Sequence, residues 1–237
     1  MKIKILATGS SKWERFIRRW GVSFLIDEDV LFDTFGDLKV LLNNIRKFNI
    51  DISKIKHIVL SHDHWDHVGG LWYLINNRKD ITVYICSGFK QETKDKIASF
   101  GVNVVEVSPL TMIKKDLFSS GQIQAFYAGN SLFEQALVIK FLKNLTVITG
   151  CAHPGIVNII DTVKKYFLRE KVSFVMGGLH LKDSSNLQIE EVISALKARG
   201  ISKVASMHCT GKAATKLLKK RFGINFLRVV EGSVIEA

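Results

Sequence analysis

Few residues in this chain restrict or cross-link the backbone. Its 237 residues include two prolines and three cysteines, at positions 86, 151 and 209. An odd number of cysteines without a CxxC pair argues against a disulfide framework and favours a reducing cytoplasm. No stretch approaches 18 uninterrupted apolar residues, and the short apolar run before Lys12 does not resemble a secretory signal. We therefore expect a cytoplasmic protein with no membrane partner.

The chain also lacks repeats, low-complexity tracts and recognisable linkers, which favours a single domain over residues 1–237. Hydrophobic residues make up 47% and charged residues 24%, so a globular core is easily formed. Acidic residues are fewer than basic ones. The chain has 34 Lys and Arg and 22 Asp and Glu, which gives a net charge of +12. Such an excess attracts phosphorylated small molecules, nucleic acid or anionic membranes, or else forms a solvated basic surface.

Apolar runs rich in β-branched residues alternate with helical patterns, and this alternation predicts helices covering both faces of packed sheets. The predicted strands are 3–7, 22–26, 30–32, 57–60, 81–86, 102–107, 123–127, 136–141, 145–149, 172–176, 203–207 and 226–230. The predicted helices are 38–48, 70–77, 90–100, 156–168, 189–199 and 212–222.

Histidine is concentrated in one turn. Residues 62–67 read His-Asp-His-Trp-Asp-His, after an apolar strand that ends at Leu60 and before Gly69-Gly70. Alternation along an extended backbone places His62 and His64 on one side, and Asp66 and His67 follow as the chain turns into a helix. Burying so many polar groups without partners would cost several kcal/mol, about 2–7 for each group. The turn therefore predicts a metal site with ligands for two neighbouring ions.

This HxHxDH motif, placed between a hydrophobic strand and Gly-Gly, resembles the signature of the metallo-β-lactamase superfamily. Leu31-Phe32-Asp33-Thr34 resembles an early strand of the same superfamily. The resemblance implies a four-layer αββα sandwich in the α/β class. It also implies that Asp33 supports the metal-binding turn; the alternative is a turn-forming aspartate.

Four further segments resemble one branch, the metal-dependent hydrolases of the β-lactamase superfamily II. They are residues 134–137, 149–158, 177–181 and 208–211. Many members of this branch carry the name 7,8-dihydropterin-6-methyl-4-(β-D-ribofuranosyl)aminobenzene-5′-phosphate synthase. The resemblance spans most of the chain, but it specifies the substrate poorly.

The remaining ligands are expected after distant strands, at the carboxyl ends where α/β sheets present functional groups. We assign His62, His64 and His153 to one metal site and Asp66, His67 and His208 to the other. Most superfamily members place a bridging aspartate where Thr149-Gly150 is followed here by Cys151. Cys151 is either a thiolate ligand or a small buried residue, and Glu134 is a distant candidate for a supplementary carboxylate.

Two residues are predicted to act in the reaction. Asp66 would hold a metal and take up or orient the proton of an attacking water. His180 follows a Gly-Gly bend and is expected to face the substrate, with proton donation or metal ligation as the alternatives. Thr210, Gly211 and Lys212 begin a predicted helix and form a candidate anion-binding site; a solvated helix residue is the alternative for Lys212.

Two divalent ions, zinc first and manganese or iron as alternatives, would activate water against a small anionic substrate, which the positive charge suggests contains phosphate. The branch name implies an alternative: a condensation at the same site in which a dihydropterin loses diphosphate to an aromatic partner. A nuclease is a third hypothesis, disfavoured because no RNA-gripping insertion is visible. A non-enzymatic metal sensor is a fourth.

The aromatic and basic run from Trp13 to Trp20 is expected to cover a pocket or bind a partner rather than to stack bases. The sequence leaves the oligomeric state open, homo-oligomers included.

Overall fold

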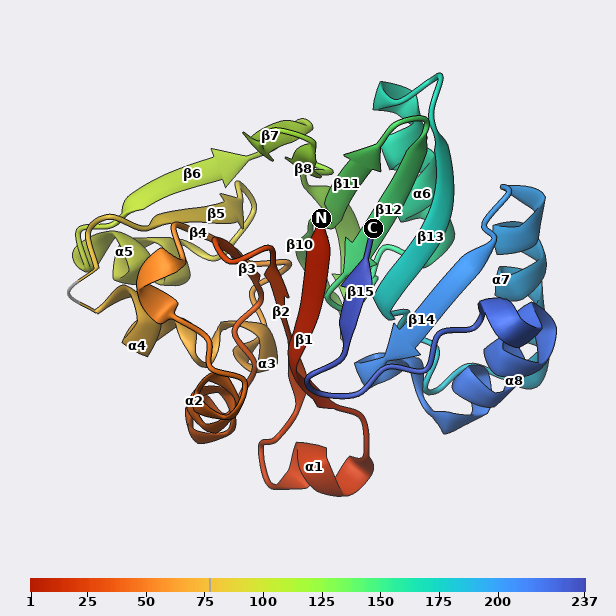
Figure 1. Cartoon of the computed structure of the whole chain (residues 1–237), viewed down its shortest axis with the longest axis horizontal. Helices are drawn as coiled ribbons and strands as arrows, with labels where there is room; N and C mark the ends of the chain where they lie inside the picture. The colour runs from red at the N-terminus through yellow and green to blue at the C-terminus, as the bar shows by residue number, and fades with distance from the viewer. Residues whose placement is uncertain (77) are drawn as a thin grey trace.

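The computed structural model describes residues 1–76 and 78–237 and consists of two β-sheets packed face to face (Figure 1). The first sheet has the strand order β15 (Val234–Glu236), β1 (Lys2–Gly9), β2 (Gly21–Ile26), β3 (Val30–Phe32), β4 (His57–Val59), β5 (Thr82–Cys86), β6 (Asn103–Val107). The second has the order β14 (Lys203–Met207), β13 (Lys171–Gly178), β12 (Asn144–Thr149), β11 (Leu137–Phe141), β8 (Leu117–Ser119), β7 (Thr111–Lys114). A separate hairpin pairs β9 (Ile123–Tyr127) with β10 (Asn130–Glu134).

Helices cover the outer face of each sheet (Figure 1). The first sheet carries α2 (Leu38–Lys47), α4 (Leu71–Ile75) and α5 (Gln91–Ser99), and the second carries α6 (Ile156–Tyr166), α7 (Asn186–Ala198) and α8 (Lys212–Phe222). Two short helices, α1 (Lys12–Phe16) and α3 (Trp65–Val68), lie in loops of the first sheet, and α1 projects from the body of the molecule. The predicted αββα sandwich is confirmed.

The central core lies between the sheets, because alternate residues of each strand point inward. Phe24 and Phe32 of the first sheet and Ile148 and Met176 of the second belong to this buried cluster. Two further clusters lie under the helices of either face. Removal of this apolar surface from water provides most of the free energy that holds the layers together.

Parallel pairing determines where the functional turns meet. Strands β3, β4, β5 and β6 run parallel in the first sheet, and β12, β13 and β14 run parallel in the second. Their carboxyl ends lie at one edge of the sandwich, where loops are free to present polar side chains.

The predicted strand 226–230 is wrong. Phe226 forms a single bridge with Val204 at the edge of β14, and the chain then turns at Gly232, which has a φ of +86°. The last strand is β15, which pairs antiparallel with β1. The short strands β7, β8, β10 and β15 were not predicted. The predicted helix 70–77 is observed as α4, and residue 77 lies outside the described residues.

No helix among the described residues is long and apolar enough to cross a membrane.

Candidate metal centre

The histidine-rich turn follows β4 and leads into α3. Its backbone is held closely against the loop after β3: a Cβ on Gly69 would lie 2.5 Å from the carbonyl oxygen of Gly36. Thr34 donates hydrogen bonds from its backbone N–H and its hydroxyl to the carbonyl oxygen of His67. The glycine therefore allows a close backbone approach that fixes the turn.

One donor cluster consists of His62, His64 and His153, whose ligand atoms all lie within 4.8 Å of one another. His62 Nε2 is 3.0 Å from His64 Nδ1. Burial and the neighbouring imidazoles hold the pKa of His62 well below its ordinary value and lower the pKa of His64 to about 4. Both rings are therefore neutral at pH 7, which is the form that ligates a metal.

A second cluster consists of Asp66, His67 and His208, again within 4.8 Å of one another. Asp66 Oδ2 is 3.3 Å from His67 Nε2 and 3.5 Å from His208 Nε2. Burial raises the pKa of Asp66, but the positive charge and the hydrogen bond of the His67 ring, with a smaller effect of His208, outweigh it and hold that pKa below its ordinary value. The carboxylate is therefore ionised at neutral pH. His208 Nδ1 lies 2.9 Å from the carbonyl oxygen of Gly9, so its Nε2 faces the cluster.

Asp33 lies behind His67, as expected from the sequence. Its fully buried carboxylate accepts hydrogen bonds from the backbone N–H and hydroxyl of Ser61, each 2.7 Å long. Its Oδ2 is also 2.6 Å from His67 Nδ1. Burial lowers the pKa of His67, but the carboxylates of Asp33 and Asp66 outweigh it and hold that pKa well above its ordinary value. With Nδ1 bonded to Asp33, a metal that displaces the Nε2 proton would find that nitrogen directed at the second cluster.

Cys151 lies beside the second cluster. Its Sγ is 3.2 Å from His208 Nε2 and 3.4 Å from His67 Nε2, and its side chain is buried. Burial raises the pKa of the Cys151 thiol in the metal-free chain. The sulfur thus lies within reach of a cation shared by these imidazoles, and a thiolate is a ligand that zinc accepts.

Glu134, at the end of β10, organises the loop after β12. One carboxylate oxygen accepts from the backbone N–H groups of Cys151 and Ala152, at 2.9 and 2.7 Å. The other accepts from the N–H of His153 at 2.8 Å and lies 2.9 Å from His153 Nδ1. The structure thus places Glu134 behind the first cluster as a support for His153. The sequence pattern suggested a supplementary carboxylate but not this loop-holding contact.

A cavity of about 480 Å³ opens in front of both clusters. Members of the clusters form one part of its wall, and His180 lies beside them, with its ring centroid 4.3 Å from that of His153. The cavity is also lined by residues that the sequence motifs did not assign to the site. These are Arg15, Trp20, Trp65, Tyr127, Lys182, Asp183, Ser184, Gln188 and Cys209. The segment from Trp13 to Trp20 therefore contributes to a pocket, which was one of its two predicted roles.

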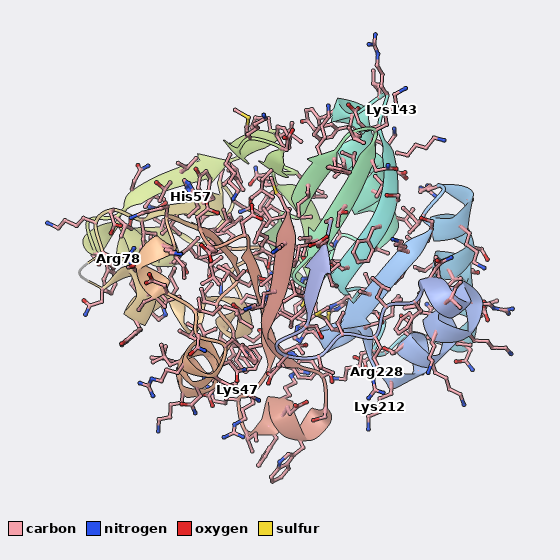
Figure 2. All side chains as sticks on the ribbon, viewed as in Figure 1. Lys47, His57, Arg78, Lys143, Lys212 and Arg228 are labelled. Atoms are coloured by element: carbon pink, nitrogen blue, oxygen red, sulfur yellow. The ribbon has the colours of Figure 1, made fainter. Side chains whose placement is uncertain are left out.

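The predicted anion-binding group is not brought to this cavity. Thr210 is fully buried, donates its hydroxyl to the carbonyl oxygen of Met207 and accepts the N–H of Leu179. Gly211 and Lys212 line a different cavity beside α8, and Figure 2 shows Lys212 at the outer surface there. Gly211, with a φ of +78°, precedes α8 at that second cavity, and anion binding by this group stays a prediction.

The two clusters fit divalent metal ions. Neutral imidazole lone pairs converge at 3.0 Å in a buried turn, and a buried carboxylate completes the neighbouring group. His180 Nδ1 is buried beside them with no hydrogen-bond partner in the part of the chain that the structure describes. Histidine, aspartate and cysteine together form a donor set typical of zinc and related ions.

Comparisons with known proteins show which chains this one is similar to. The family model for the metallo-β-lactamase superfamily matches residues 21–103. The chain is 28% identical to 7,8-dihydropterin-6-methyl-4-(β-D-ribofuranosyl)-aminobenzene-5′-phosphate synthase of Methanocaldococcus jannaschii, over 93% of this chain and 91% of that protein. It is 30% identical to the uncharacterized protein MJ0448 of the same organism, over 91% and 93% of the two chains.

A solved structure shows the same relationship. The crystal structure of Tm1679, a metal-dependent hydrolase of the β-lactamase superfamily, matches with a TM-score of 0.80 and 29% identity, over 100% of this chain and 99% of that one. The fold, the family model and the full-length relatives together show that this chain belongs to the metallo-β-lactamase superfamily.

Proposed function

We propose that this protein is a metal-dependent hydrolase that acts on a small, anionic, phosphate-containing substrate. The observation that carries the proposal is the pair of donor clusters facing one cavity. His62, His64 and His153 would hold one ion, and Asp66, His67 and His208, with Cys151, would hold a second. When bound, two such ions make water nucleophilic near neutral pH and stabilise charge on an attacked phosphoryl or carbonyl oxygen. Zinc is the first candidate because histidine dominates the donors.

The protein's own residues supply orientation and proton transfer. Asp66 is ionised and buried at the cavity wall, so its carboxylate is placed to accept a hydrogen bond from an attacking water and orient it. His180 lies on the same wall and is placed to contact the substrate or to donate a proton to a leaving group. The buried pairing of Asp33 with His67 keeps the ligand ring in one orientation.

The test combines metal content with turnover. Purified chain loaded with zinc is expected to hold two ions and to hydrolyse bis(4-nitrophenyl) phosphate, and His64→Ala is expected to lose turnover. His57→Ala is a matched control, because His57, which is labelled in Figure 2, begins β4 and belongs to no donor cluster among the described residues. Failure to bind metal and to hydrolyse the ester, in folded wild-type protein, would overturn the proposal.

A synthase activity is the second candidate, favoured by the name of the full-length relative at 28% identity. In that reaction the same residues would bind a dihydropterin diphosphate, and diphosphate would leave as an aromatic partner attacks. Diphosphate release that requires both the pterin and the aromatic partner, with no hydrolysis of phosphodiesters, would favour this candidate.

A further inference from the structure

The cavity in front of the metal centre has two chemically different parts. His64, Asp66, Cys151 and His153 form the reacting wall. Two cationic side chains, from Arg15 of α1 and Lys182 of the loop after β13, line the same cavity. Both belong to segments outside the metal-binding motif. Their presence gives the cavity an anion-attracting part that the metals do not supply.

Contacts fix the position of Lys182. Its Nζ lies 5.4 Å from the ring centroid of Trp20, within the range of a cation–π contact. Trp20 is only 6% exposed, and its ring lies 4.7 Å from that of His208, between centroids. The ammonium group is therefore held over an aromatic ring that itself packs on a proposed metal ligand.

The backbone holds Lys182 from the other side. Its N–H donates to the carbonyl oxygen of Cys209 at 3.1 Å. A Cβ at Gly211 would lie 2.6 Å from Lys182 Cα, so only glycine lets the two loops approach this closely. Gly211 therefore serves the cavity indirectly, by allowing Lys182 to enter it.

The two cations are available to a ligand. Neither Arg15 nor Lys182 forms an ion pair within the described ranges 1–76 and 78–237. Asp183 also lines the cavity, so this part carries two positive charges against one negative charge. Trp20, Trp65 and Tyr127 supply aromatic surface in the same cavity.

We infer that Lys182, assisted by Arg15, determines specificity by binding a second anionic group that the substrate carries away from its reacting bond. The aromatic walls favour a flat body between the two groups. The substrate class is thus a planar molecule with a reacting phosphate at one end and a carboxylate or phosphate at the other. This inference rests on the proposed hydrolase function.

The test compares two esters that differ in one anionic group. Phenyl 4-nitrophenyl phosphate carries no remote anion, and 4-carboxyphenyl 4-nitrophenyl phosphate carries a carboxylate. Zinc-loaded wild type is expected to show a KM about three- to tenfold lower for the carboxylated ester, as for one partly exposed charge-assisted hydrogen bond. In Lys182→Ala the two KM values become equal while kcat changes less than about twofold. The reason is that Lys182 would bind the remote anion equally well in the ground state and in the transition state.

Three further variants sharpen the comparison. Lys182→Arg keeps the charge and is expected to keep the lower KM for the carboxylated ester. Gly211→Ala displaces the Lys182 backbone and is expected to reduce this preference for the carboxylated ester. Lys212→Ala is the control, because Lys212 lines the other cavity, and its preference should equal that of wild type. A preference that survives in Lys182→Ala, or is lost in Lys212→Ala, would overturn the inference.

A binding measurement separates this inference from the proposed function. If wild type hydrolyses neither ester, the hydrolase proposal fails, and calorimetry with phenylphosphonate and 4-carboxyphenylphosphonate then tests the anion subsite alone. Tighter binding of the carboxylated compound in wild type, lost in Lys182→Ala, supports the subsite. Equal binding of the two compounds by wild type rejects it.

Discussion

Replacing Asp33 tests how the centre is built, because this carboxylate touches a proposed ligand without facing the cavity. It accepts two hydrogen bonds from Ser61 and one from His67 Nδ1, at full burial. Asp33→Ala removes the acceptor of two buried donors, the Ser61 N–H and His67 Nδ1, at about 1–3 kcal/mol each before relaxation, whereas the Ser61 hydroxyl still lies 2.8 Å from His62 Nδ1. We expect the free energy of unfolding to fall by about 3–5 kcal/mol, a large share of the roughly 5–15 kcal/mol typical of a domain.

Asp33→Asn separates stability from metal binding. The amide of asparagine can still accept from Ser61, but its NH₂ group faces His67 Nδ1 and favours the tautomer protonated at Nε2. That proton occupies the atom 3.3 Å from Asp66 and 3.4 Å from Cys151, which must be free to bind a metal. We expect the zinc affinity of the site formed by Asp66, His67 and His208 to fall by about 10- to 100-fold. Losses of this size are typical when a residue that supports a metal ligand is replaced.

Competition with a chromophoric zinc chelator measures this loss, and urea unfolding of the metal-free protein measures stability. Asp63→Asn is the matched control in the same turn, because Asp63 bonds instead to Thr93 and the backbone of Lys90. The reasoning would be refuted if Asp33→Asn bound both ions like wild type. It would be refuted equally if Asp63→Asn lost the same affinity.

Three other substitutions have definite expected outcomes. Glu134→Ala leaves three backbone N–H groups and the His153 ring without their acceptor, so urea unfolding should show a loss of at least about 3 kcal/mol; an unchanged midpoint would contradict this. Gly150→Ala places a Cβ 2.1 Å from Ser61 Oγ, and metal analysis after dialysis should show reduced occupancy, whereas full occupancy would mean that the turn tolerates displacement. Cys151→Ser should weaken binding of one zinc ion if the sulfur is a ligand, and chelator competition identical to wild type would assign Cys151 to packing.

The sequence predicted the site best where its residues are neighbours in the chain. The HxHxDH turn could be found from spacing alone, since all its donors follow one strand. The support from Glu134 depends on a hairpin that reaches the loop after β12, and the position of Lys182 depends on Gly211. Such contacts join segments that local patterns do not relate, so only the fold reveals them.

The anion-site prediction shows the same limit. A glycine followed by lysine at a helix start is a reasonable local signal for anion binding. In the folded chain, however, Lys212 lines a different cavity from the one in front of the histidine clusters, and Gly211 instead lies against the backbone of Lys182. The strands β7, β8, β10 and β15 were missed for a related reason, because each has only three to five residues and shows no clear alternation.

The metal centre lies at the seam between the two sheets, and this position has a consequence for assembly. His62, His64, Asp66 and His67 come from the turn after β4 of the first sheet. Cys151, His153 and His208 follow β12 and β14 of the second sheet. An intermediate in which only one sheet has formed would hold an incomplete set of donors around each ion. If two ions bind as proposed, each would link a turn of the first sheet to a turn of the second, and metal retention would then report that the two halves of the chain have packed together.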